Sequence, residues 1–362
     1  MRIFTIIGAR PQFIKASVVS RAIRKSEGIE EIILHTGQHF DDSLAAGVAR
    51  DLALRQPDVQ LDLGGLPRGA QIGRATDALT TLFAEDPPAA VIVQGDTNSG
   101  LAGALAANAQ EVPLVHVEAG LRSHDRAMPE EHNRVLIDHI ADICAAPTDA
   151  AADNLANEGI PGSRIAVTGN TVIEAVQRMV PDDARRALLR KEYGIDDGAF
   201  VLATVHRPEN VDAEPALRAV LEGLVALDEP VLFPMHPRTA ARCREFGLDA
   251  LASQLHVVDP TTPSDFLGLA KEASLLVSDS GGVQEEVSVI KRPVLVVRRS
   301  TERPEALGTF AELIRPDQIA GRGAWYLHGE GADRDLTNTP SPFGDGSASR
   351  RIVDLVCESI GG

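Results

Sequence analysis

The feature that most constrains the fold of this 362-residue chain is a regular alternation of short apolar runs with amphipathic segments. The runs are rich in Val, Ile and Leu and apolar on both faces, which is typical of buried parallel strands. The segments between them, such as 99–110 and 214–228, carry helical periodicity. We expect strands at residues 2–8, 30–37, 89–95, 112–118, 141–147, 164–170, 200–206, 230–236, 255–260, 273–279 and 292–298. This alternation predicts an α/β fold with two doubly wound domains.

The chain is also longer than one hydrophobic core usually supports. A helix near 171–179 leads into a polar stretch, so we divide the chain into an N-terminal domain, 1–170, and a second domain, 171–344. The last segment begins with a Pro/Gly loop and ends in an amphipathic helix, 345–362, which we expect to pack back on the first domain. This return would make the interdomain cleft a hinged one, and the ligand belongs in that cleft.

Composition narrows the class of ligand. A formal net charge of −17 argues against a nucleic-acid partner, so an anionic ligand needs a local basic site. The three cysteines lie far apart, which is typical of reduced thiols in a cytosolic protein. The start of the chain lacks the features of a signal peptide, and no apolar run is long enough to span a membrane. We therefore expect a cytoplasmic protein that binds neither nucleic acid nor membrane.

The first predicted strand runs into a glycine turn and a helix start in IIGARPQFIKAS, residues 6–17. Arg10 and Lys15 would project from this helix start, where backbone N–H groups and the helix dipole favour an anion. An ordinary strand–helix loop with solvated cations is the alternative. The chain has neither a G-x-G-x-x-G nor a Walker-type G-K-[ST] loop, so we expect no NAD, ATP or other cofactor.

A second glycine turn lies in LLVSDSGGVQEEVSVI, residues 275–290. Ser280, Gly281 and Gly282 can present hydroxyl and backbone N–H donors to a phosphate, and glycine leaves room for a diphosphate. Glu285 and Glu286 would repel phosphate but could accept hydrogen bonds from ribose hydroxyls. An acidic helix start that complements the helix dipole is the alternative, and we favour the phosphate site.

Other candidate ligand contacts follow strands of the second half. His206 stands at a strand end, where it is a candidate acid, base or phosphate partner, although a lone His is more often structural. His236 repeats this pattern. Phe266 could stack on a base, with core packing as the commoner fate of such a residue. Arg303 follows the last predicted strand and approaches the same edge.

Carboxylates follow two consecutive strands of the first half. Asp96 comes directly after Gly95, and Glu118 stands where an apolar strand should continue. A Glu in that position needs a partner or a function, and the candidate partners are Arg122 and Arg134. Asp96 alone could cap the next helix. Together, at the edge where ligands of open α/β sheets bind, the two acids suit proton transfer.

A third acidic position lies in PEEHNR, residues 129–134, where Glu130 and Glu131 begin a predicted helix. Either one could be a first-turn acid that complements the helix dipole. The chain has no HExxH motif and no Cys/His ligand set, so we expect no metal site.

The order of these motifs resembles that of the non-hydrolysing UDP-N-acetylglucosamine 2-epimerase family. The matching stretches cover nearly the whole chain and are GARPQFIK, TGQH, QGDTNS, HVEAGLRS, MPEEHNR, TGNTVIEA, HRPEN, SDSGGVQEE, TERPEAL and PFGDGSASRRI. The resemblance implies two Rossmann-like domains of the glycosyltransferase-B type, with UDP held mainly by the second. It also implies a UDP-linked N-acetylhexosamine substrate and a homodimer formed through the first domain.

The resemblance further implies that UDP leaves C1 as C2 is deprotonated, and that UDP then adds back to the bound glycal with protonation on the other face. Such a reaction needs a diphosphate clamp, carboxylates on both faces of the sugar and a closed cleft. By motif, the implied acid/base carboxylates are Asp96, Glu118 and Glu130, with His206 as a partner on the phosphate side and Glu131 left as a helix-start acid. The implied ligand contacts are Arg10, Lys15, Ser280, Gly281, Gly282 and Arg303 for phosphates or sugar, Glu286 for ribose and Phe266 for uracil.

Two departures from the family pattern bear on substrate and regulation. Many bacterial members begin G-T-R-P-E, whereas GARPQ is more like members that act on 2,3-diacetamido uronic sugars. Pro208 replaces an Arg of the site through which UDP-N-acetylglucosamine activates many bacterial enzymes, although Gln38 and His39 of that site are present. Our lead prediction is a UDP-N-acetylglucosamine 2-epimerase. The alternatives are a 2-epimerase of a modified sugar such as a UDP-2,3-diacetamido-uronate, a glycosyltransferase of the same architecture and a non-catalytic nucleotide-sugar sensor.

Overall fold

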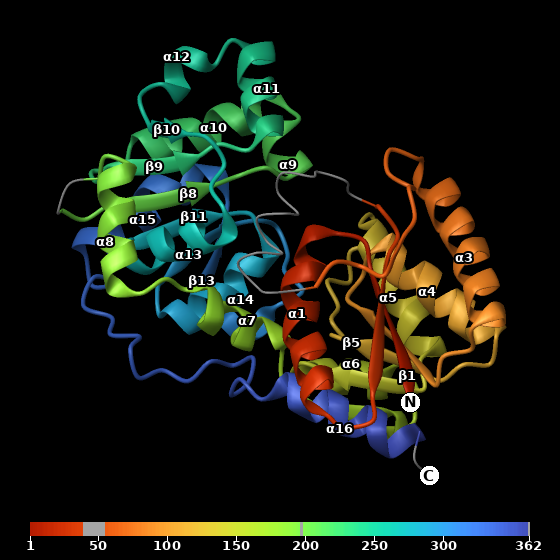
Figure 1. Cartoon of the computed structure of the whole chain (residues 1–362). Coiled ribbons are helices and arrows are strands. Elements are labelled where there is room, and N and C mark those ends of the chain that lie inside the picture. The colour runs from red at the N-terminus through yellow and green to blue at the C-terminus, as the bar shows by residue number, and fades with distance from the viewer. Residues whose placement is uncertain (39–54, 196–197, 361–362) are drawn as a thin grey trace. The chain divides into compact units, whose positions relative to one another are not determined.

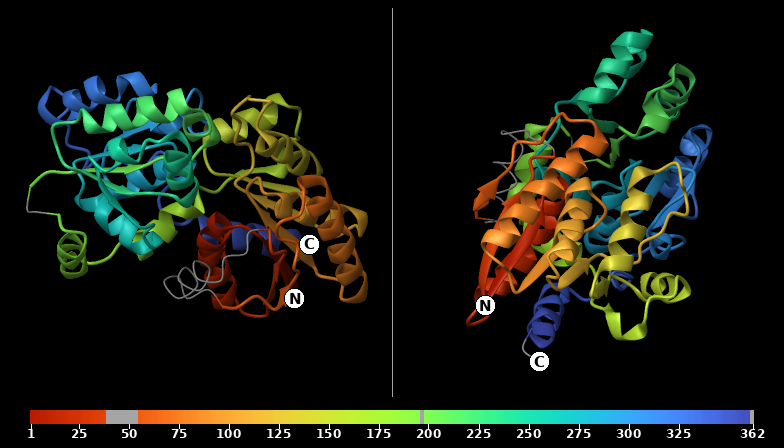
Figure 2. Two further views of the ribbon diagram at one scale, coloured as in Figure 1. Left: turned by 90° about the horizontal axis from the view of Figure 1, so that it is seen from above. Right: turned by 90° about the vertical axis from the view of Figure 1, so that its right-hand side faces the viewer.

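The computed structural model describes residues 1–38, 55–195 and 198–360, and the chain divides into two compact units (Figure 1). The first unit combines Met1–Ala175 with Phe343–Gly362, and the second is Val176–Pro342. In the described part of the chain, each unit is built on one parallel sheet flanked by helices (Figure 2). The predicted fold class, two Rossmann-like α/β domains, is confirmed.

The first unit has, within its described residues, a seven-stranded parallel sheet in the order β3-β2-β1-β4-β5-β6-β7. Its strands are β1 Arg2–Ile7, β2 Glu30–His35, β3 Val59–Gln60, β4 Ala90–Gln94, β5 Leu114–Val117, β6 Ile143–Ala146 and β7 Ile165–Val167. Its helices are α1 Arg10–Lys25, α3 Arg68–Glu85, α4 Asn98–Ala109, α5 Pro129–Ile140, α6 Asp149–Asn157, the 3-10 turn η1 Gly162–Arg164, α7 Thr171–Met179, which runs into the second unit, and α16 Ala348–Ile360. The strand order reverses between β1 and β4, which are neighbours in the sheet.

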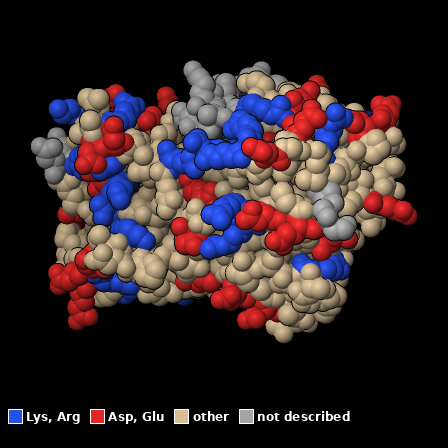
Figure 3. All heavy atoms as spheres, turned by 60° about the horizontal axis from the view of Figure 1, so that its bottom comes forward, with Lys and Arg blue, Asp and Glu red and all other residues tan. Residues whose placement is uncertain are grey.

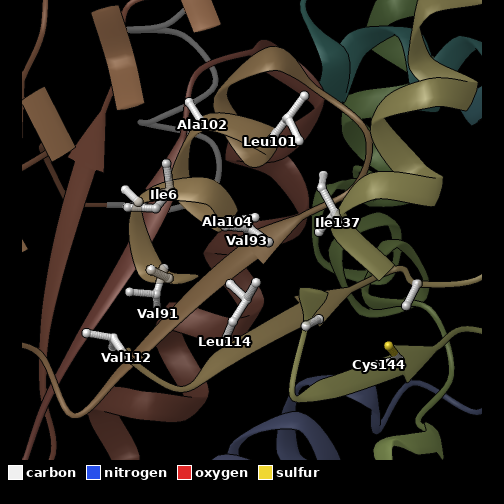
Figure 4. Packing of buried hydrophobic residues seen from close by; sticks show 14 of the residues in the cluster. Ile6, Val91, Val93, Leu101, Ala102, Ala104, Val112, Leu114, Ile137 and Cys144 are labelled. Carbon is white, nitrogen blue, oxygen red and sulfur yellow. The ribbon is translucent and has the colours of Figure 1, made fainter. Parts of the chain in front are cut away.

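Alternate residues of these strands pack on opposite faces of the sheet, as the period of two requires. On one face, Phe4 and Ile6 of β1 and Val93 of β4 share a core with α3, α4 and α5. Figure 4 shows Ile6 and Val93 in this core together with Leu101 of α4 and Ile137 of α5. On the other face, Ile3 and Ile92 pack with residues of α1 and α16. Because helices cover both faces, the strands are mostly apolar, which is why they stand out in the sequence.

The second unit repeats this arrangement with six parallel strands, counted over its described residues, in the order β10-β9-β8-β11-β12-β13. Its strands are β8 Val201–Thr204, β9 Val231–Pro234, β10 His256–Val258, β11 Leu275–Ser278, β12 Val294–Val297 and β13 Ala311–Ile314. Its helices are α8 Asp183–Glu192, α9 Pro208–Val211, α10 Glu214–Val225, α11 Pro237–Phe246, α12 Asp249–Ala252, α13 Pro263–Glu272, α14 Gly281–Ile290, the 3-10 turns η2 Pro304–Ala306 and η3 Pro316–Gln318, and α15 Ile319–His328. Here the strand order reverses between β8 and β11.

The surface mixes the two signs of charge. On the face that Figure 3 presents, Lys and Arg side chains are interspersed with Asp and Glu rather than gathered apart from them. The net charge of −17 is therefore not segregated into one acidic field on this face. None of the described helices is long and apolar enough to cross a membrane.

Candidate active site

In each sheet, candidate residues lie at the carboxyl ends of strands that flank the reversal of strand order or stand next to it. In the first unit, the loop after β4 carries Gly95 and Asp96, and Glu118 follows the neighbouring β5. In the second unit, His206 follows β8 and Asp279 follows β11. Ligands of open α/β sheets bind at such reversals. The residues that the sequence singles out therefore fall on two sheet edges, one in each unit.

Glu118 comes directly after the last residue of β5, and its backbone φ is 71°. Its carboxylate forms an ion pair with Nζ of Lys15, and Nδ2 of Asn170 lies 3.5 Å from the same oxygen. Only 7% of the Glu118 side chain and 10% of the Lys15 side chain are exposed, so each charge depends on the other. Of the two candidate partners, Arg122 pairs with Asp138 and Glu158, and Arg134 pairs with Asp96 and Glu131.

Asp96 follows Gly95, whose φ of 66° is a conformation that glycine adopts readily and other residues rarely do. Its Oδ2 lies 2.5 Å from Nη2 of Arg134, while 30% of the side chain remains exposed. Its carbonyl oxygen accepts a hydrogen bond of 2.8 Å from Nδ2 of Asn133. The alternative role as a helix cap is wrong, because the hydroxyl of Thr97 caps α4. The Asp96 carboxylate is thus oriented by Arg134 and still reaches solvent.

The adjacent acids Glu130 and Glu131 have different environments in the first turn of α5. Glu131 is buried, accepts hydrogen bonds from the backbone N–H groups of Ser123 and His124 at 3.0 and 2.8 Å, and pairs with Arg134 at 2.7 Å. Burial alone would raise the pKa of Glu131, but these donors and the Arg134 charge hold it below its usual range. Glu131 therefore holds the loop before α5 in place. Glu130 is exposed, and the described contacts do not bring it into this network.

Asp279 organises the corresponding edge of the second unit. Its buried carboxylate accepts hydrogen bonds from the backbone N–H groups of His206 and Arg207, at 3.0 and 2.8 Å, and from Nδ2 of Asn210 at 3.0 Å. The His206 ring lies 3.3 Å from the same carboxylate and is 37% exposed. It also lies against the ring of His236, with centroids 5.3 Å apart, and His236 itself caps α11. Asp279 thus fixes the backbone that presents His206 to solvent.

The predicted phosphate loop leads into α14, whose first turn holds no acidic residue. Ser280 is the N-cap residue, and its hydroxyl makes no capping bond. A Cβ added at Gly281 would lie 2.8 Å from Oε1 of Glu302 and 2.9 Å from Nη1 of Arg303, so a larger residue there would displace the ends of these two side chains. Arg303, expected to hold phosphates, pairs with Glu302 and, at 2.8 Å, with buried Glu285. Arg303 is therefore already paired with two carboxylates of the chain, one of which, Glu302, also pairs with Arg298 at 2.9 Å.

The remaining residues predicted to contact the ligand are half-buried, or their side chains lie outside the described part of the chain. Glu286 lies half-buried on α14, and a Cβ added at Gly282 would be 3.7 Å from its Oε1. Phe266 is half-buried on α13 rather than enclosed in the core. The side chain of Arg10 and the whole of His39 lie outside the described residues. Within the described ranges, no group of His, Cys, Asp and Glu is placed to hold a metal ion.

Comparison with known proteins assigns the chain to a family. A family model described as UDP-N-acetylglucosamine 2-epimerase matches residues 21–357. The chain belongs to this epimerase family. A UDP-N-acetylglucosamine 2-epimerase from Methanocaldococcus jannaschii is 38% identical to it, over 98% of this chain and 99% of that protein. A UDP-2,3-diacetamido-2,3-dideoxy-D-glucuronate 2-epimerase from Pseudomonas aeruginosa is also 38% identical to this chain, over 99% of this chain and 100% of that protein.

The crystal structure of the M. jannaschii UDP-GlcNAc 2-epimerase in complex with UDP-GlcNAc and UDP matches this epimerase-family fold with a TM-score of 0.88. The sequences are 36% identical over 99% of this chain and 100% of that chain. The resemblance drawn from the motifs is therefore confirmed over nearly the full length. Two relatives named for different sugars match equally well, so overall identity does not choose between those sugars.

Three residues that contact groups at these strand ends were not predicted from the sequence of this epimerase-family member. Asp279 ends an apolar run, which is the signal that identified Asp96, but it received no role. His116 is a polar residue inside the buried strand β5, the same signal that identified Glu118. Asn170 gave no signal of its own, since its contact with Glu118 spans 52 positions in the sequence.

Proposed function

We propose that this protein interconverts UDP-N-acetylglucosamine and UDP-N-acetylmannosamine by eliminating UDP and adding it back. The observation that carries this proposal is Glu118, a residue with positive φ whose buried carboxylate pairs with Lys15 on the same sheet edge as Asp96. A residue that has a strained backbone and an ion-paired carboxylate, at an edge where ligands bind, is suited to proton transfer. Full-length relatives named as 2-epimerases of UDP-sugars support the same chemistry.

The reaction balances without a redox partner. A carboxylate removes the proton from C2, the C–H electron pair forms the C1=C2 double bond, and the C1–O bond breaks so that UDP leaves with its electron pair. The 2-acetamidoglucal stays bound beside UDP. When UDP adds back to C1, a carboxylic acid protonates C2 on the opposite face and the epimer results. The two faces need separate acid/base groups, and Asp96, Glu118 and Glu130 are our candidates.

We propose that the second unit binds the UDP portion at its own sheet edge. The N-terminus of α14 offers backbone N–H groups of Gly281 and Gly282 and the Ser280 hydroxyl to the phosphates. Because Arg303 is already paired with Glu285 and Glu302, we expect these N–H groups to carry most of the diphosphate contact. Further proposed contacts are His206 and Arg10 for phosphate, Glu286 for ribose and Phe266 for uracil.

A 2-epimerase of a UDP-2,3-diacetamido-uronate is the second candidate. It is favoured by the GARPQ motif and by the P. aeruginosa relative, which matches as well as the M. jannaschii one. Parallel assays with UDP-N-acetylglucosamine and a UDP-2,3-diacetamido sugar separate the two. Turnover of the second sugar alone would replace the lead substrate and leave the C2 chemistry unchanged.

The decisive experiment for the reaction class is incubation of the protein with UDP-N-acetylglucosamine in deuterated water. We expect deuterium at C2 of both epimers, detected by NMR or mass spectrometry, because the C2 proton is exchanged with solvent during the reaction. A glycosyltransferase would instead transfer the sugar to an acceptor and leave C2 protonated. A sensor would bind UDP without any exchange, and either result would overturn the proposal.

Assembly and location remain predictions. We expect a homodimer formed through the first unit, which light scattering on the purified protein would test. We also expect a cytoplasmic location, which cell fractionation would test.

A further inference from the structure

His116 makes two contacts that the proposed chemistry does not use directly. It lies in β5, two positions before Glu118, and its side chain is fully buried. Nδ1 lies 2.5 Å from Oδ1 of Asp138, and Nε2 lies 2.9 Å from the carbonyl oxygen of Gly95. The ring therefore joins a helix residue on one side to the loop after β4 on the other.

The hydrogen positions follow from the partners. A carbonyl oxygen only accepts, so Nε2 carries the hydrogen that it donates to Gly95. The second oxygen of Asp138 accepts from the Gly120 backbone N–H at 3.1 Å and faces Nη2 of Arg122 at 2.8 Å. Burial alone would raise the pKa of Asp138, but His116 and Arg122 hold it below its usual range. Asp138 is therefore an ionised acceptor that orients the ring and leaves Nε2 aimed at Gly95.

The Gly95 peptide is held by β5 at both ends. Its N–H donates to the carbonyl oxygen of Val117 at 2.9 Å, and its C=O accepts from His116. Gly95 has a φ of 66° and directly precedes Asp96, while Val117 directly precedes Glu118. Both clamps therefore act one residue away from a candidate acid/base carboxylate. Without the His116 contact, one side of the Gly95 turn would lose its attachment.

We propose that His116 is a positioning residue for the epimerisation, which fixes Asp96 relative to Glu118 by donating a hydrogen bond to the Gly95 carbonyl. This inference rests on the proposed function of those two carboxylates. A small displacement of a reacting group lowers the rate far more than it lowers binding, because the reaction depends on aligned atoms. The competing view is that His116 only satisfies the buried charge of Asp138 and stabilises the first unit.

Two amide substitutions of His116 separate these views. In His116→Gln, the side-chain nitrogen reaches the position of Nε2 and keeps a donor toward Gly95, while the Asp138 contact is lost. In His116→Asn, the nitrogen reaches the position of Nδ1 and keeps the Asp138 contact, while the Gly95 contact is lost. His139→Gln, an exposed change on α5, is the matched control and keeps the wild-type kcat.

We expect His116→Asn to lower kcat for UDP-N-acetylglucosamine epimerisation about 100-fold, with KM within about threefold of wild type. We expect His116→Gln to keep at least about tenfold more kcat than His116→Asn, even where its thermal stability is lower. Deuterium incorporation at C2 should follow kcat in each variant. The opposite order, with His116→Asn the more active enzyme per folded protein, would overturn the proposal in favour of a structural role.

If His116→Asn does not fold, Asp138→Asn provides a second test of the proposal. An Asn there can accept from Gly120 and Arg122 and donate to Nδ1 of His116, which leaves the Nε2 contact with Gly95 intact. We expect this variant to keep kcat within about tenfold of wild type. A kcat about 100-fold lower than wild type, measured on protein that is folded, would contradict the proposal. If the wild-type protein incorporates no deuterium at C2, the proposed function fails first. If it does, and the order of the variants is reversed, only the role of His116 fails.

Discussion

Glu118 occupies a position at which a glutamate is unfavourable for folding. A φ of 71° disfavours any side chain by about 1–2 kcal/mol, and glycine would relieve that strain. The buried carboxylate also requires Lys15 as a partner, which an apolar residue at the end of β5 would not. The backbone strain and the buried charge, both unfavourable, occur together at this one residue. This combination is typical of a position retained for its chemistry.

Substitution of Glu118 by Gln tests that assignment at the level of one side chain. The amide keeps an oxygen that can accept from Lys15 but cannot take up the C2 proton, so we expect kcat to fall about 10²- to 10⁴-fold. Steady-state kinetics and C2 deuterium exchange measure the loss, and thermal unfolding checks that the variant folds. Glu111→Gln is a matched control, because Glu111 is an exposed glutamate that also has positive φ. Wild-type activity in Glu118→Gln would remove Glu118 from the mechanism.

The candidate residues could be predicted from the sequence more reliably than their partners. Glu118 and Asp96 are visible because an acid at the end of an apolar run is costly unless it is used. Lys15, the partner of Glu118, precedes it by 103 positions. The two meet only because β1, β4 and β5 are adjacent in the sheet and α1 follows β1. The nearer arginines were the natural expectation, yet Asp96, Glu131, Asp138 and Glu158 already hold them.

At the level of elements, strands were predictable where helices cover both faces of the sheet. β4 is apolar at nearly every position because no face of it meets water. The unpredicted strands are β3 and β13, and both give weak signals. β3 has only two residues, and β13 carries Glu312, which pairs with Arg322 of α15. Short edge strands with polar residues resemble loops in the sequence, so their pairing becomes evident only in the sheet.

Three elements, β1, β2 and α1, meet around a buried carboxylate. Glu31 of β2 accepts hydrogen bonds from Thr5 of β1, at 2.8 Å, and Ser20 of α1, at 2.5 Å. Burial nevertheless raises the pKa of Glu31 above its ordinary value of 4.5, because these hydroxyls and more distant arginines offset burial only in part. The folded state therefore binds a proton more readily than the unfolded chain. The stability that this provides is complete below pH 4.5 and is lost as the pH rises through the raised pKa.

Glu31→Gln should therefore stabilise the packing of these three elements at neutral and alkaline pH. The amide can keep both hydroxyl partners and has no charge to bury. We expect a higher free energy of unfolding than wild type at pH 8, and a difference that shrinks toward pH 4. Urea unfolding at several pH values measures this trend. Glu30→Gln, an exposed neighbour in β2, should show no such gain, and a wild-type advantage for Glu31 at pH 8 would contradict the prediction.

On the scale of the whole molecule, the chain enters the first unit twice. Residues 343–362 return to it after the second unit is complete, and α16 packs on the face of the sheet that α1 covers (Figure 1). Ile352 and Val356 of α16 are fully buried with Ile3 of β1 and Val19 of α1. The first unit therefore depends on the far end of the chain for one face of its core. The second unit builds its core from its own residues.

Ile352→Ala should separate the stabilities of the two units. Removing a buried isoleucine typically lowers the free energy of unfolding by about 2–5 kcal/mol, and here the loss should be confined to the first unit. Trp325, the single tryptophan of the chain, lies in α15, so its fluorescence reports only the second unit. We expect the early part of the urea transition followed by circular dichroism to shift, while the Trp325 midpoint stays at its wild-type value. Glu358→Ala, an exposed change on the same helix, should move neither signal. If both signals shift together in Ile352→Ala, the two units unfold as one cooperative structure, and α16 would then stabilise the whole molecule rather than the first unit alone.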